Sequence, residues 1–149
     1  MVGVDFDAKA IEVHKRVYPR LDARLHQAED SLQGIFPDGA DVILAVEVVE
    51  HLYRPAKFLT EARDALRPGG HVLLTTPYRG YLKNLVVSLL GQWDHVFTVA
   101  WEEGHIKFFS EPTMRDMLEE VGFRDVVFGN AGRLPYLWKT LVVRASRGA

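Results

Sequence analysis

The stretch from Asp41 to Leu52 constrains the fold of this chain more than any other. Its apolar run, residues 42–46, predicts a strand that is buried on both faces of a parallel sheet. Two carboxylates and an imidazole follow directly: Glu47, Glu50 and His51. Because ligands of open α/β sheets bind outside the carboxyl ends of the strands, we expect these side chains to face a site. The alternative is that both glutamates are solvated loop residues and that the histidine caps a turn.

Strands and helices alternate along the rest of the chain. The patterns predict strands at 2–5, 21–26, 42–46, 71–76, 123–128 and 137–144, and helices at 8–18, 55–66, 81–90 and 111–121. Residues 93–109 are aromatic and predicted to be irregular. This order favours an α/β fold with a mostly parallel sheet. The last two strands have no helix between them, which predicts one antiparallel strand near the C-terminus.

Composition excludes several classes of protein. The length of 149 residues fits one domain, and 18 basic against 20 acidic residues leave no basic surplus for a nucleic-acid partner. The chain has no cysteine, which excludes disulfides, thiolate catalysis and cysteine-ligated metals. The N-terminus lacks the pattern of a signal peptide, and the longest apolar stretch, 82–90, is too short to span a bilayer. We expect a cytoplasmic protein without a transmembrane segment.

Four segments carry a resemblance to a known family. They are Val2–Asp5, Asp41–Leu52, Leu66–Gly70 before a strand, and Gly104–Ser110 before a helix that ends in Glu119–Phe123. In this order they resemble the class I S-adenosylmethionine-dependent methyltransferases, in particular the group of the ubiquinone-biosynthesis O-methyltransferases. The resemblance implies a Rossmann-like fold and S-adenosylmethionine as the cofactor. A Rossmann oxidoreductase is disfavoured, because no Gly-x-Gly-x-x-Gly fingerprint is present.

One family feature is absent from the sequence. The first strand and its loop, Gly-x-Gly-x-Gly, should precede Val2. That loop lets the backbone approach the cofactor, because glycine has no side chain. We therefore expect a truncated, N-terminally incomplete domain over residues 1–149, whose missing strand a second copy could supply in a homodimer. Two functions stay open: methyl transfer to a small molecule, or a methyltransferase-fold protein that no longer binds the cofactor.

The resemblance also assigns cofactor contacts. It implies that Asp5 accepts hydrogen bonds from the two ribose hydroxyls, whereas the residue type alone would also suit a helix N-cap. The other expected contacts are Phe6, Gln27 and Ala28 at the adenine and Glu47 and Val48 near the reactive methyl group.

Chemistry at a hydroxyl acceptor needs a base, and imidazole titrates near neutral pH. His51 is the first candidate and His105 the second. Glu47, Glu50, His51 and His105 also resemble the metal-binding set of the small-RNA 2′-O-methyltransferases. We prefer the interpretation that both histidines make ordinary hydrogen bonds and that no metal binds.

The segment 78–109 is more apolar than a solvated loop. We expect it to cover the substrate, which favours an apolar or amphipathic small molecule. The alternative is that its apolar side chains only form a satellite core against the sheet.

Overall fold

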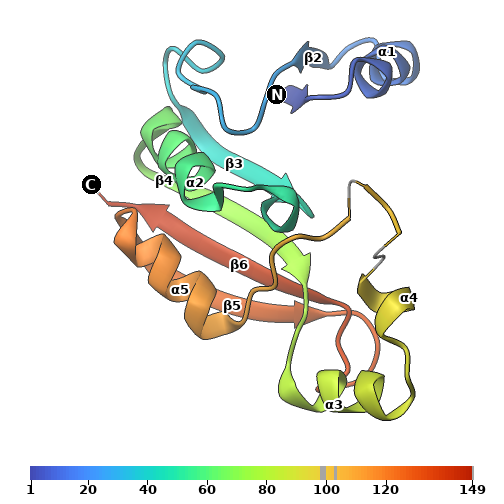
Figure 1. Ribbon diagram of the computed structural model, residues 1–149. Coiled ribbons are helices and arrows are strands. Elements are labelled where there is room, and N and C mark those ends of the chain that lie inside the picture. Colours follow the sequence, from blue (N-terminus) through green and yellow to red (C-terminus); the bar gives the residue numbers. More distant parts are fainter. Residues whose placement is uncertain (98–99, 103, 149) are drawn as a thin grey trace. The chain divides into compact units, whose positions relative to one another are not determined.

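The chain divides into two units, residues 1–31 and residues 32–149, each of which has its own strands. We describe them from a computed structural model, which covers residues 1–97, 100–102 and 104–148. In the first unit, strands β1 (Val2–Asp5) and β2 (Asp22–Leu25) pair in parallel, and helix α1 (Ala8–Val17) lies between them in the sequence (Figure 1). The helix begins at Asp7, whose side chain accepts a hydrogen bond from the amide of Lys9.

The second unit is built on a four-stranded sheet with the order β3-β4-β6-β5 (Figure 1). Its strands are β3 (Ala40–Val46), β4 (Leu66–Pro77), β5 (Phe123–Ala131) and β6 (Thr140–Arg147). Strand β3 pairs in parallel with β4, whereas β6 is antiparallel to both of its neighbours. The predicted antiparallel strand is confirmed, but the mostly parallel sheet is wrong for this unit. The sheet is mixed because β6 is inserted between β4 and β5.

The five helices that the structure describes in this unit precede β5. They are the short 3-10 helix η1 (Val49–His51) and the α-helices α2 (Pro55–Ala65), α3 (Tyr81–Leu89), α4 (Trp93–Phe97) and α5 (Glu111–Glu120). Helix α4 corrects the prediction that the whole segment 93–109 is irregular. Strand β6 starts at Thr140 rather than Leu137, because β5 continues to Ala131, which pairs with Thr140. No described helix is long and apolar enough to cross a membrane.

Helices α2 and α5 lie on the same face of the sheet in Figure 1. Their stripes of Phe58, Leu59, Met114 and Leu118 are buried, as are the strand residues that share this face by register. These strand residues are Ile43, Ala45, Val72, Leu74, Leu141, Val143 and Ala145. The core of the unit therefore lies between this face of the sheet and the two helices.

The opposite side of β3 corrects another prediction. Val42, Leu44 and Val46 alternate with the core residues and are 53–64% exposed. The strand is therefore not buried on both faces. It is an edge strand of its sheet, and α2 and α5 cover only one side of it.

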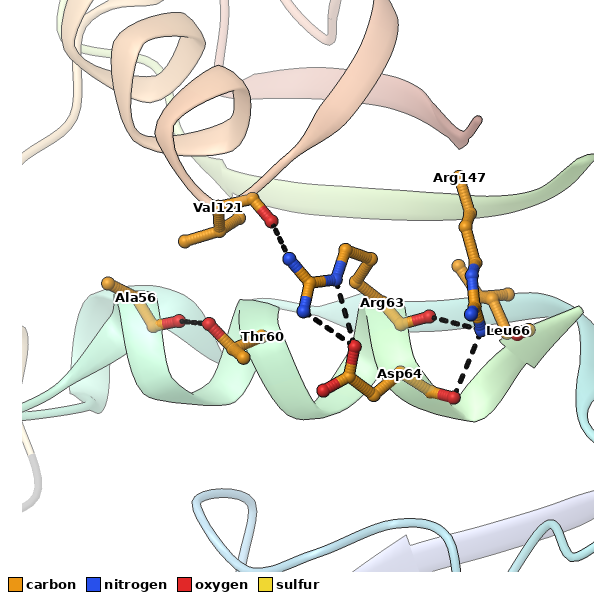
Figure 2. A network of polar contacts seen from close by, with 7 residues as sticks. All are labelled: Ala56, Thr60, Arg63, Asp64, Leu66, Val121 and Arg147. Carbon is orange, nitrogen blue, oxygen red and sulfur yellow. Dashed lines mark hydrogen bonds and ion pairs between the residues drawn. The ribbon is translucent and has the colours of Figure 1, made fainter. Parts of the chain in front are cut away.

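Two arginines secure the end of α2 (Figure 2). The guanidinium of Arg147, on β6, donates hydrogen bonds to the carbonyls of Arg63, Asp64 and Leu66. Arg63 in turn donates to the carbonyl of Val121, just after α5, and forms an ion pair with Asp64. Since the last carbonyls of a helix have no partner within it, these contacts satisfy them and fasten α2 to the sheet and to α5.

Candidate functional site

A sharp change of direction at Glu47 ends β3 and places the following residues at the carboxyl edge of the sheet. Glu47 has a φ of 52°, which is the left-handed region that residues with side chains seldom adopt. Its amide donates to the Thr75 carbonyl and hydroxyl at 3.0 and 3.1 Å, and Thr75 Oγ1 donates to Glu47 Oε1 at 3.0 Å. Hydrogen bonds with Thr75 of β4 therefore stabilise the left-handed backbone conformation of Glu47, which costs about 1 kcal/mol or more of free energy. Backbone strain of this kind is often found at functional sites.

Glu50 is the most deeply buried acidic residue of the described chain. Its exposed fraction is 0%, and neither carboxylate oxygen has a hydrogen-bond partner within the described ranges. Its backbone carbonyl accepts from the amides of Ile106 and Lys107 at 2.9 and 3.0 Å, which brings the segment around His105 alongside η1. The interpretation of Glu50 as a solvated loop residue is therefore wrong.

Two histidines lie beside this carboxylate. The rings of His51 and His105 have centroids 4.9 Å apart, and His105 Nε2 lies 4.0 Å from Glu50 Oε1. One ligand atom from each of Glu50, His51 and His105 lies within 4.8 Å of the others. We call these three residues the acid–histidine cluster. Residues far apart in sequence thus converge at the carboxyl end of β3, as expected for an open α/β sheet.

The surroundings of Glu50 and His105 favour the uncharged forms of these two side chains. Burial raises the pKa of Glu50 to about 7; repulsion from Glu47 adds to this, while the Glu50 amide, Thr76 and His51 oppose it. Burial also lowers the pKa of His105, and the nearby His51 and Arg79 lower it further. A neutral imidazole is the form that can accept a proton, so His105 is suited to act as a base near neutral pH.

The cluster borders a cavity of about 700 Å³. His105 lines it, together with Arg79, which lies between β4 and α3, and with residues of α3, α4 and the segment after α4: Asn84, Trp93, Asp94, Phe97, Trp101, Glu102, Gly104, Ile106 and Phe108. Trp93 and Phe97 stack with centroids 4.7 Å apart, and Phe97 meets Phe108 edge to face at 4.8 Å. The volume is within the range of small-molecule sites, and the aromatic lining suits a flat or apolar ligand.

The four residues of the metal hypothesis are only partly brought together. Glu50, His51 and His105 converge, whereas Glu47 is not part of the group and uses Oε1 to accept from Thr75. A buried carboxylate without a hydrogen-bond partner, beside two imidazoles, fits a divalent cation chemically. The prediction that no metal binds is untested, and metal binding stays the alternative.

The expected cofactor residues occur in both units. In the first unit, Asp5 ends β1, and Phe6, Gln27 and Ala28 follow the paired ends of β1 and β2. Asp5 Oδ1 accepts from the Asp7 amide at 2.8 Å, and the N-cap of α1 is Asp7 rather than Asp5. Asp5 and the ring of Phe6 are exposed. Their contacts with the ribose and adenine of the cofactor stay a prediction. Glu47 and Val48 lie in the second unit, at the end of β3.

The sequence patterns had not singled out Thr75 and Arg79. Thr75 lies near the carboxyl end of β4, and Arg79 follows that strand. Strand β4 pairs in parallel with β3. The signal was available, because neighbouring parallel strands end at the same edge of a sheet.

Comparison with known proteins defines the class. A family model described as a methyltransferase domain matches residues 1–127. The chain therefore belongs to this methyltransferase family. A protein of Mycolicibacterium smegmatis named "probable S-adenosylmethionine-dependent methyltransferase" is 38% identical over 81 residues, which cover 53% of this chain and 30% of the relative.

Other relatives match over more of the chain. The mitochondrial ubiquinone biosynthesis O-methyltransferase of Schizosaccharomyces pombe is 30% identical over 126 residues, covering 80% of this chain and 45% of the relative. The chain thus spans less than half the length of either curated relative. The solved structure of the S-adenosylmethionine-dependent methyltransferase SibL has a TM-score of 0.76 at 22% identity, covering 99% of this chain and 43% of SibL. This likeness establishes the Rossmann-like methyltransferase fold.

Proposed function

We propose that this chain takes part in S-adenosylmethionine-dependent methylation of a hydroxyl group on a small molecule. The observation that carries the proposal is the acid–histidine cluster, whose His105 lines an aromatic cavity, in a chain that belongs to a methyltransferase family. The names of the relatives favour oxygen as the methylated atom. The cavity favours a flat or apolar acceptor.

Asp5 and Phe6 would hold the adenosine part of the cofactor, and Glu47 and Val48 would lie near its reactive end. The chemistry supplied by bound S-adenosylmethionine is an electrophilic methyl group. The remaining tasks belong to the protein: to orient the acceptor, to exclude water and to take a proton. We assign the proton to an imidazole nitrogen of His105, because this residue lines the cavity and burial favours its neutral form. His51 and Glu50 position its ring.

Cofactor binding is the first experiment. We expect calorimetry with S-adenosylhomocysteine to show micromolar binding to the folded chain and at least tenfold weaker binding to Asp5→Ala. Asp30→Ala, at an exposed position of the same unit, is the matched control and should bind normally. No binding by a chain that circular dichroism shows to be folded would favour the alternative, a methyltransferase-fold protein without cofactor binding. Transfer of a labelled methyl group to a panel of small phenols then tests the reaction itself.

A metal-dependent form of the reaction is a second candidate, supported by the buried carboxylate of Glu50, which has no hydrogen-bond partner among the described residues. In that case Glu50, His51 and His105 would hold a divalent cation that binds the acceptor oxygen. Calorimetry with Mg²⁺, Mn²⁺ and Zn²⁺ on protein stripped with EDTA tests it directly. Binding that is lost in Glu50→Gln supports the metal, and no heat with any of the three ions refutes it.

A further inference from the structure

Arg79 places a cation in a largely aromatic cavity. Its guanidinium carbon lies 4.4 Å from the centre of the Phe97 ring and 5.2 Å from that of Phe108. Such cation–π contacts fix the plane of the guanidinium without using its N–H groups. The side chain is therefore held in place while its hydrogen-bond donors stay available.

Among the residues that the structure describes, few partners use the N–H donors of Arg79. Arginine carries five N–H donors, and the hydrogen bond found for Arg79 is a contact of 3.4 Å between Nη2 and His105 Nδ1. No ion pair between Arg79 and a carboxylate is found among the described residues, whereas Arg24, Arg63, Arg67 and Arg115 each form one. A half-buried guanidinium in this state is a ready partner for a carboxylate or phosphate, which arginine binds through two parallel hydrogen bonds.

The other charges of the cavity do not occupy this position. Asp94 and Glu102 line the cavity, but both are exposed, and neither forms an ion pair with Arg79 in the structure. Glu50 and Glu47 interact with Arg79 only as more distant charges, and burial opposes its charged form. Anchoring the ring stack is the competing role for this arginine, because Phe97 and Phe108 pack against it.

We propose that Arg79 is a specificity-determining residue that binds an anionic group, a carboxylate or phosphate, on the acceptor. This inference deepens the proposed function and rests on it. The aromatic rings would hold the flat part of the acceptor, and the contact with His105 would bring its anionic group close to the base. The acceptor class is then a flat, hydroxyl-bearing molecule that also carries a carboxylate or phosphate group.

The test compares three probes of the same shape by saturation-transfer NMR titration of the full chain. They are 2-naphthoate, its neutral amide 2-naphthamide, and the cation 2-naphthylmethylammonium. We expect the wild type to bind the carboxylate about tenfold or more tightly than the amide, since hydrogen bonds between a guanidinium and a carboxylate are stronger than those to a neutral group. Arg79→Gln should bring the ratio close to one, and Arg79→Lys should keep part of it. Arg16→Gln, at an exposed position of α1, is the control and should leave the ratio unchanged.

The ratio separates recognition from packing. A purely structural arginine would weaken all three probes together in Arg79→Gln and leave their ratio unchanged, which would overturn the proposal. Equal binding of acid and amide by the wild type, preference for the cation, or no binding of any probe would also overturn it. Calorimetry with S-adenosylhomocysteine is independent of these titrations, so loss of cofactor binding with an intact ratio would refute only the proposed function.

Discussion

Replacement of Glu50 by glutamine removes the one fully buried carboxylate of the cluster and keeps its shape. Because the pKa of about 7 in the folded chain lies above the ordinary value of 4.5, folding favours the protonated acid. The stability that depends on this group is complete below pH 4.5 and is lost as the pH rises to 7 and beyond. The loss approaches about 3 kcal/mol, at about 1.4 kcal/mol for each tenfold change in proton affinity.

The assay is urea unfolding of wild type and Glu50→Gln in EDTA, at several pH values from 5 to 8. The unfolding free energy of the wild type should fall by about 2–3 kcal/mol relative to the variant across this range, because other titrating groups cancel in the difference. Glu120→Gln, at an exposed position near the end of α5, should track the wild type.

A difference between wild type and Glu50→Gln that stays constant from pH 5 to 8 would refute the reasoning, since it would mean that Glu50 ionises as easily in the folded chain as in the unfolded one. Replacing EDTA with a divalent cation gives a second result. If the metal-dependent form is correct, the wild type should gain stability at pH 8 and the variant should not.

Three further predictions concern other parts of the chain. Arg147→Met should lower the free energy of unfolding, measured in urea, by about 2 kcal/mol, because the carbonyls of Arg63, Asp64 and Leu66 lose their hydrogen-bond donor. Unchanged stability would show that water replaces the guanidinium. Ser110→Ala should cost about 1 kcal/mol, since Ser110 and Thr113 cap α5 reciprocally, and an unchanged melting temperature would contradict this. Thr75→Val should weaken S-adenosylhomocysteine binding several-fold in calorimetry, because Thr75 holds the left-handed turn at Glu47; normal affinity would separate that turn from the cofactor.

The sequence by itself determined the order and type of most elements. Local periodicity predicts a strand before Glu47 and helices at 55–66 and 111–121. The structure has β3, α2 and α5 in these segments. The placement of acidic and imidazole side chains after β3 was also predictable, because they directly follow the strand in the sequence, at the carboxyl end where open α/β sheets bind ligands.

Only the tertiary structure decided how the strands pair and which side chains meet. Periodicity cannot distinguish a strand buried on both faces from an edge strand, and so the exposure of Val42, Leu44 and Val46 was not foreseen. The insertion of β6 between β4 and β5 is likewise a non-local pairing. The burial of Glu50 depends on a segment more than fifty residues away, whose amides bind its carbonyl. Local sequence fixes local conformation, whereas the pKa of a side chain and the partners of a guanidinium depend on groups that only the folded chain brings together.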